Sequence, residues 1–137
     1  ALVHGGATVH ACEWNPEATK ALSWGLDANG VERRCTIHEG DNRGATESLA
    51  GTADRVFLGL LPSSEEGLEV AMRVLSPSGG TLHVHGLAPS KDHASWVDGV
   101  LSSASSLRLG SDLSHSLTRV KSYAPHWDHV VLDLRVA

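Results

Sequence analysis

A short apolar run that ends in an acid, Val9 to Glu13, is followed by the pair Asn15-Pro16, and this pattern most constrains the chain. An acid at the tip of such a strand is typical of nucleotide-binding α/β units, where it can bind both hydroxyls of a ribose. A Gly-rich loop should stand about twenty residues before that acid. Only twelve residues precede Glu13, and they contain no strand followed by such a loop. The sequence therefore predicts a cofactor-binding domain from its second strand onward.

Strand and helix patterns alternate along the rest of the chain. We expect the last turn of a helix at Ala1 to Val3 and a helix that begins at Asn15-Pro16, a good N-cap followed by a good first residue. A second helix should be capped by Ser63 or Ser64. The expected strands are 8–13, 34–39, 54–61, 81–86, 117–122 and 129–136, and the expected helices are 16–29, 64–74 and 93–105. This order predicts an α/β fold with a mostly parallel sheet and an antiparallel C-terminal hairpin. The run 54–61 is expected to be a central strand buried on both faces.

Composition excludes several classes of protein. The chain has 137 residues, 41% hydrophobic residues, two cysteines and a net charge of −5. This charge does not favour nucleic-acid binding by the chain alone, because phosphate contacts need clustered Lys and Arg. No apolar run approaches the roughly 20 residues of a membrane span, and no signal peptide is visible. Two cysteines do not suggest a disulfide framework, so we expect a cytoplasmic protein with no membrane partner.

Five segments of the chain, taken in order, resemble tRNA wybutosine-synthesizing protein 2, a class I S-adenosylmethionine-dependent transferase. They are CEWNPEA at 12–18, GDNR at 40–43, ADRVFLGLLPSSEEG at 53–67, GGTLHVHG at 79–86 and VKSYAPHWDHVVLDL at 120–134. The related tRNA guanine-N1 methyltransferases usually have Asn-Leu-Pro where this chain has Leu60-Leu61-Pro62 followed by Ser63-Ser64. The match therefore favours the wybutosine enzyme over its sister family.

The resemblance implies a Rossmann-like class I methyltransferase fold without its first strand, with residues 1–137 forming a partial transferase domain. In the full-length protein it implies transfer of the 3-amino-3-carboxypropyl group of S-adenosylmethionine to 4-demethylwyosine in phenylalanine tRNA. The tRNA would bind mostly through regions outside this chain. Glu13 matches the ribose-binding acid, and Asp41 and Asn42 match the pair that reaches the adenine. Asp41 could accept from the exocyclic amine, and Asn42 offers both a donor and an acceptor.

Other interpretations stay open. The chain could belong to a tRNA guanine-N1 methyltransferase, or it could be a non-catalytic remnant, since loss of a central strand would expose two sheet edges. From position alone, Glu13 could be a surface acid and Asp41-Asn42 a plain Asx-turn. The oligomeric state is not predictable.

Pro62, Ser63 and Ser64 follow a strand that should face the substrate, so they are candidates for the target-base pocket. Transfer of a carbon group from a sulfonium needs mainly alignment of the nucleophile. The sequence therefore identifies no catalytic residue, although Glu65 is also close to the expected site.

Histidines and cysteines suggest other sites less strongly. His83 and His85 share a strand face and could form a metal site with His126 and His129, but we expect none, because neither pair has a helical HExxH context. Cys12 and Cys35 are predicted to be buried thiols on neighbouring strands.

The loop Tyr123-Ala124-Pro125 is expected to turn the chain. An exposed aromatic there could also stack on an RNA base, and Arg119 and Lys121 add positive charge nearby.

Overall fold

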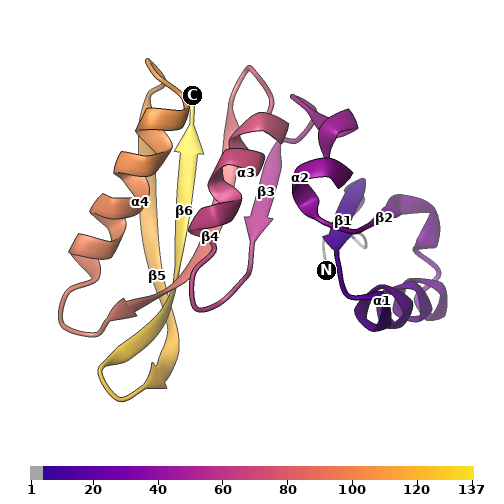
Figure 1. The fold of residues 1–137 in the computed structure, drawn as a ribbon, viewed down its shortest axis with the longest axis horizontal. Coiled ribbons are helices and arrows are strands. Elements are labelled where there is room, and N and C mark those ends of the chain that lie inside the picture. Colours follow the sequence, from indigo (N-terminus) through magenta and orange to yellow (C-terminus); the bar gives the residue numbers. More distant parts are fainter. Residues whose placement is uncertain (1–4) are drawn as a thin grey trace. The chain divides into compact units, whose positions relative to one another are not determined.

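The computed structural model describes residues 5–137, so the helical turn predicted at Ala1 to Val3 lies outside the described residues. The chain divides into two compact units, one that ends at Ser48 and one that spans Leu49–Ala137 (Figure 1). Each unit has its own sheet. No helix within residues 5–137 is both long and apolar enough to cross a bilayer.

The first unit is a parallel strand pair with a crossover helix. Its elements are β1 (Val9–Glu13), α1 (Pro16–Ala28), the 3-10 turn η1 (Glu32–Arg34), β2 (Cys35–Glu39) and α2 (Asn42–Ala45), with a further 3-10 turn, η2 (Glu47–Leu49), at the division. β1 and β2 run parallel, with Val9 opposite Cys35 and Glu13 opposite Glu39. This parallel pair joined by a helix is the βαβ unit that the alternating pattern predicts.

Helix α1 begins where the sequence predicts. The side chain of Asn15 accepts a hydrogen bond from the backbone N–H of Glu17 at 3.0 Å, and Pro16 is the first helical residue. The cap satisfies a donor that the helix itself cannot pair, and the fixed φ of proline suits the first turn. This prediction is confirmed.

The second unit is a four-stranded sheet with two helices. Its elements are β3 (Arg55–Leu58), the 3-10 turn η3 (Glu65–Gly67), α3 (Leu68–Val74), β4 (Gly80–Pro89), α4 (His93–Leu107), β5 (Leu113–Ala124) and β6 (Trp127–Val136). The strand order is β3-β4-β6-β5. β3 and β4 are parallel, whereas β4 with β6 and β5 with β6 are antiparallel. The C-terminal hairpin is confirmed, but the sheet is mixed rather than mostly parallel.

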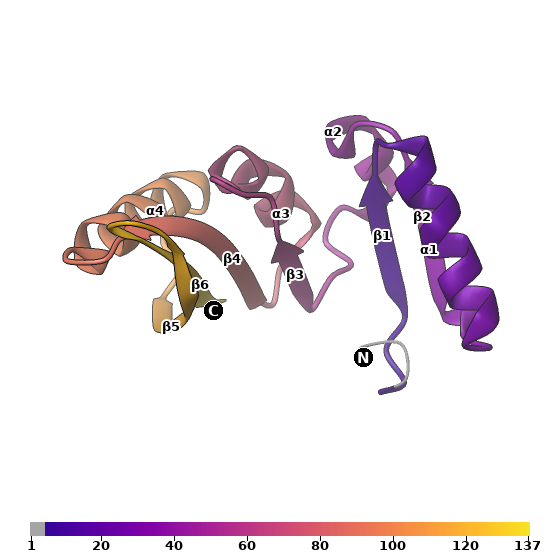
Figure 2. The same cartoon turned by 90° about the horizontal axis from the view of Figure 1, so that it is seen from below.

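The core lies between the helices and one face of this sheet. Figure 2 shows α3 and α4 on the same side of the sheet. The fully buried residues of the core come from α3, β4, α4 and β6, and they include Leu68, Leu82, Val100, Leu132 and Leu134. Alternate residues of β4 and β6 face this layer, and the residues between them, such as His83 and Asp133, face the other side.

Three sequence expectations need correction. The strand predicted at 54–61 spans only Arg55–Leu58 and is not buried on both faces, because Phe57 is 48% exposed. Within residues 5–137 β3 pairs with β4 alone, so it is an edge strand. The helix predicted to begin near Ser64 begins at Leu68. The strand predicted at 117–122 starts four residues earlier, at Leu113.

Candidate functional site

The strand ends of the first unit bring the predicted cofactor residues to one edge of its sheet. β1 ends at Glu13 and β2 ends at Glu39, which lies opposite it. The turn that follows β2 is joined to β1, since the N–H of Gly40 donates to the backbone oxygen of Glu13 at 3.0 Å. Asp41 and Asn42 come directly after this contact. The parallel pairing therefore gathers Glu13, Asp41 and Asn42 at the carboxyl edge, where α/β units bind ligands.

Glu13 presents a partly engaged carboxylate. Its Oε1 accepts from the backbone N–H of Asn15 at 2.8 Å, which holds the side chain against the start of α1. No other hydrogen bond to this carboxylate is formed within residues 5–137. An ionised carboxylate can accept several hydrogen bonds. Glu13 thus retains acceptor capacity for a pair of vicinal hydroxyls, and the ribose role stays a prediction.

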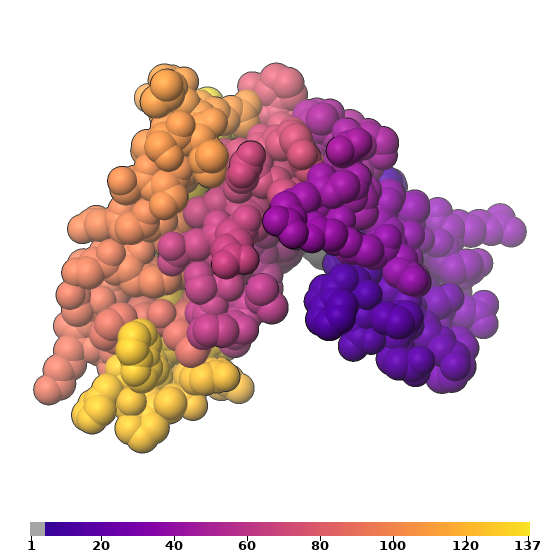
Figure 3. Space-filling view, viewed as in Figure 1, coloured from indigo at the N-terminus to yellow at the C-terminus, as the bar shows by residue number. Residues whose placement is uncertain are grey.

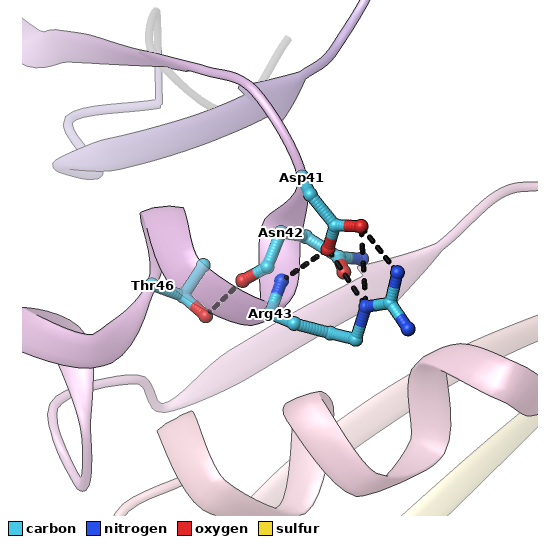
Figure 4. Close-up of polar contacts among 4 residues, drawn as sticks. All are labelled: Asp41, Asn42, Arg43 and Thr46. Atoms are coloured by element: carbon cyan, nitrogen blue, oxygen red, sulfur yellow. Dashed lines mark hydrogen bonds and ion pairs between the residues drawn. The ribbon is translucent and has the colours of Figure 1, made fainter.

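Asp41 already has a partner, as Figure 4 shows. Its Oδ1 accepts from the backbone N–H of Arg43 at 2.9 Å, so Asp41 caps the short helix α2. The Arg43 guanidinium lies across both carboxylate oxygens, with Nε 2.9 Å from Oδ1 and the terminal nitrogen 2.5 Å from Oδ2. These contacts lower the pKa of Asp41 to about 2. The Asx-type capping turn is therefore real, and an adenine amine could bind Asp41 only if the Arg43 side chain moved.

Asn42 lies exposed at the first position of α2. Its backbone oxygen accepts from the Thr46 hydroxyl at 2.5 Å, and this contact closes the turn of the helix (Figure 4). Its side-chain amide has no hydrogen bond within the described part of the chain. The amide is therefore available to a ligand, and the adenine role of Asn42 also stays a prediction.

The predicted pocket residues lie in the second unit, alongside β4. The peptide bond between Leu61 and Pro62 is cis, and the oxygen of Pro62 accepts from the N–H of Leu87 at 3.1 Å. Ser63 forms an isolated antiparallel β-bridge with Gly86, and the Ser64 hydroxyl donates a hydrogen bond to the backbone oxygen of His85 at 2.5 Å.

The two serines differ in exposure and in partner. Ser64 is buried and its side chain caps no helix, so the capping prediction is wrong for it. Ser63 is exposed, and its hydroxyl accepts from the N–H of Glu65 at 3.2 Å in the way of a capping residue. Of the pair, Ser63 is the hydroxyl available to a substrate.

The histidines form pairs on the open face of the sheet. His83 Nδ1 lies 2.7 Å from Oδ1 of Asp133, and His85 Nδ1 lies 3.0 Å from Nε2 of His129. Burial lowers the pKa of His85, with further lowering from His129 and His83. Among residues 5–137 no three His, Cys, Asp or Glu side chains converge as metal ligands do.

Both cysteines are free, on neighbouring strands as expected. The prediction that both are buried is wrong, because Cys12 is exposed and Cys35 is only partly buried.

Arg43 and Trp127 were missed by the sequence reasoning as candidate functional residues. The spacing of Asp41 and Arg43, two residues apart after a strand, could have signalled a capping ion pair. No local signal marks the exposure of Trp127, which depends on the register of β5 with β6.

No family model matches the chain. The tRNA wybutosine-synthesizing protein 2 homolog of Danio rerio is 42% identical to it over an alignment of 170 residues in length. This alignment covers 97% of this chain and 41% of the relative. A crystal structure of P. horikoshii TYW2 in complex with MeSAdo is 30% identical, with a TM-score of 0.86 over 98% of this chain and 50% of that one. A crystal structure of M. jannaschii TYW2 in complex with AdoMet is 26% identical, with a TM-score of 0.82 over 93% of this chain and 56% of that one.

These likenesses agree with an α/β fold of the kind found in class I S-adenosylmethionine-dependent transferases. The chain spans about two fifths to somewhat over half the length of these three relatives. Over that length the chain is a homologue of tRNA wybutosine-synthesizing protein 2.

Proposed function

We propose that this chain is part of a transferase that moves the 3-amino-3-carboxypropyl group of S-adenosylmethionine to 4-demethylwyosine in phenylalanine tRNA. The observation that carries the proposal is the 42% identity to a wybutosine-synthesizing protein over nearly the whole chain. Two structures of similar proteins contain MeSAdo and AdoMet, which supports the choice of cofactor. Residues 1–137 would form one partial transferase domain, and the reaction would take place in the cytoplasm.

The proposed cofactor residues have the chemistry that the cofactor requires. Glu13 would accept hydrogen bonds from the ribose hydroxyls, because its carboxylate is only partly engaged. Asn42 would offer its amide to the adenine edge. Asp41 would accept from the adenine amine after the Arg43 side chain turns away. When bound, S-adenosylmethionine supplies the carbon group that is transferred.

Pro62 and Ser63 are the proposed pocket residues, with Ser64 as their support. Ser64 is hydrogen-bonded to β4, so it would hold the segment in shape while exposed Ser63 meets the target base. This division suits a reaction in which alignment of the nucleophile matters more than acid–base catalysis.

The proposed fold is a class I transferase domain without its first strand. Support comes from the two parallel pairs, β1 with β2 and β3 with β4, whose strands β1 and β3 each have a single neighbour among the described residues.

The experiment is isotope transfer by the longer protein. Phenylalanine tRNA that carries 4-demethylwyosine is incubated with S-adenosylmethionine, which is labelled either in the methyl group or in the aminocarboxypropyl carbons. Label from the aminocarboxypropyl carbons in the tRNA is the expected result. Label from the methyl group would overturn the proposal and indicate a tRNA methyltransferase. If neither labelled form of the cofactor transferred label to the tRNA, the result would overturn the proposal and support the non-catalytic alternative.

A further inference from the structure

The end of the β5–β6 hairpin lies at the same edge of the sheet as the proposed pocket. Trp127 pairs with Pro89 at the carboxyl end of β4, and Ser63 bridges Gly86 three residues earlier on that strand. In Figure 1 the turn of the hairpin extends past the N-terminal end of α4, and in Figure 3 it forms a yellow protrusion. Carboxyl strand ends are where α/β domains receive their substrates.

Two β-bulges shape this end of the hairpin. Between Arg119 and Lys121 the register shifts by one residue, and it shifts again between Ser122 and Ala124. Two residues of β5, Val120 and Tyr123, are therefore left without a partner on β6. A bulge turns its extra residue out of the ordinary alternation of a strand and often redirects a side chain next to a functional site.

The bulged residues are exposed large hydrophobic side chains. Val120 is 49% exposed and Tyr123 is 54% exposed. Trp127, which begins β6 opposite Ala124, is 45% exposed. Two aromatic rings and one apolar side chain therefore lie exposed within a few residues of the hairpin turn.

Hydrogen bonds hold the hairpin end in place. Nε of Arg119 lies 2.9 Å from Oδ2 of the buried Asp128, and Nε2 of His93 lies 3.0 Å from the same oxygen. The N–H of Ser90 donates to the oxygen of His126 at 2.9 Å. The network ties both hairpin strands to the start of α4. A preorganised surface loses less conformational entropy when a partner binds.

We propose that Tyr123 and Trp127 form a stacking surface for unpaired bases of the tRNA loop, and that they position the substrate at Ser63. The proposal rests on the proposed function. Unpaired RNA bases stack on exposed aromatic side chains, and cations nearby contact the phosphates. Residues 117–127 contain Arg119, Lys121 and no acid, in a chain whose net charge is −5. Because Asp128 engages Arg119, exposed Lys121 is the residue available to a phosphate.

The experiment measures RNA binding by the longer protein that contains this chain. The probe is a fluorescein-labelled anticodon stem-loop of phenylalanine tRNA, compared by anisotropy with the same stem closed by a short, fully stacked loop. Tyr123→Leu removes the ring and keeps an apolar side chain, whereas Tyr123→Phe keeps the ring. Trp24→Leu is the matched control, because Trp24 is 66% exposed and lies in the other unit.

The wild-type protein should prefer the anticodon stem-loop. Tyr123→Leu should weaken its binding at least about fivefold, the lower limit for loss of one stacked base, and Tyr123→Phe should retain it. Equal binding by Tyr123→Leu, an equal loss in Trp24→Leu, or no preference by the wild type would each overturn the proposal. Near-UV circular dichroism of each variant confirms that the fold is kept.

Isotope transfer by the longer protein separates this proposal from the function. If aminocarboxypropyl transfer occurs and Tyr123→Leu leaves KM for the tRNA unchanged, the stacking surface is wrong and the function stands. If stem-loop binding depends on Tyr123 but no label is transferred, the proposed function is wrong and the surface stands.

Discussion

The hydroxyl of Ser64 donates a hydrogen bond to the backbone oxygen of His85 at 2.5 Å. The two residues are 21 positions apart, and the contact fastens the segment that follows β3 to the middle of β4. Ser64 is only 4% exposed, so its proton is committed to the fold. Ser63, its exposed neighbour, makes one weaker contact with the N–H of Glu65.

Ser64→Ala should therefore lower the free energy of unfolding more than Ser63→Ala. The carbonyl of His85 loses its hydroxyl partner in Ser64→Ala, at a cost of about 1 kcal/mol, whereas Ser63→Ala should cost less than about half of that. Urea unfolding followed by circular dichroism measures both variants. An equal loss in the two variants would show that the Ser64 contact does not stabilise the fold.

Arg43→Ala should tighten binding of S-adenosylmethionine to the longer protein. The exposed pair of Arg43 with Asp41 must open before the adenine amine reaches Asp41, and exposed pairs are weak, so the gain in affinity should be small. Asp41→Asn should weaken binding. Isothermal titration calorimetry measures both, with Arg33→Ala as a control that removes an equal charge from the same unit. Weaker binding by Arg43→Ala would mean that the pair helps to form the site.

Local signals explain which parts of the fold could be predicted. The beginning of α1 depends on Asn15 and Pro16, which act within one turn, so the sequence predicts it correctly. The parallel pairing of β1 with β2 follows from a strand–helix–strand order. Glu13 could be nominated because it ends the strand β1, and Asp41 because it lies in the turn just after β2. Each of these features is encoded within a few residues.

Features that depend on distant partners could not be predicted. The apolar run at 54–61 has the composition of a central strand, but its exposure depends on which strand lies beside it, and β3 has β4 alone within residues 5–137. The bulges at Val120 and Tyr123 arise from the register of β5 against β6. The Ser64 hydroxyl could have capped a helix, and only the approach of His85 decides its partner.

Arg119→Gln should shift acid unfolding to higher pH. Hydrogen bonding to Arg119, with further help from His93, holds the pKa of Asp128 below its ordinary value in the folded chain. The contribution of Asp128 to stability is therefore complete above the ordinary aspartate pKa of about 3.9, and it is lost as the pH falls through the lower folded pKa. Without Arg119 the folded pKa rises, so stability is lost earlier during acidification. Near-UV circular dichroism against pH gives the midpoint.

Arg135→Gln is the matched control for that titration, because it removes the same charge from an exposed position of the same sheet. Its midpoint should shift less than that of Arg119→Gln. Equal shifts in the two variants would indicate a general effect of net charge.

Gly79→Ala and Gly99→Ala should change stability in opposite directions. Gly79 has a φ of +100°, and a Cβ there would collide with the backbone oxygen of Val136. The substitution should cost more than about 1 kcal/mol. Gly99 lies within α4 with no atom within 4 Å of an added Cβ, so alanine should stabilise the helix by about 0.5–1 kcal/mol. Urea unfolding measures both, and destabilisation by Gly99→Ala would contradict the helical assignment of that position.

The isolated chain should associate with itself through its strand edges. β1 and β3 each pair on one side only among the described residues, and unpaired edges offer backbone groups to another chain. Phe57, 48% exposed on β3, adds apolar surface at that edge.

Phe57→Lys places a charge on the edge strand, where natural proteins often have one, and should reduce association measured by sedimentation velocity. Leu60→Ser removes a more exposed side chain outside the strand and should reduce association less. If the two variants are equally effective, general hydrophobicity rather than edge pairing drives association, and a monodisperse wild-type monomer with a cooperative melt would contradict the prediction altogether.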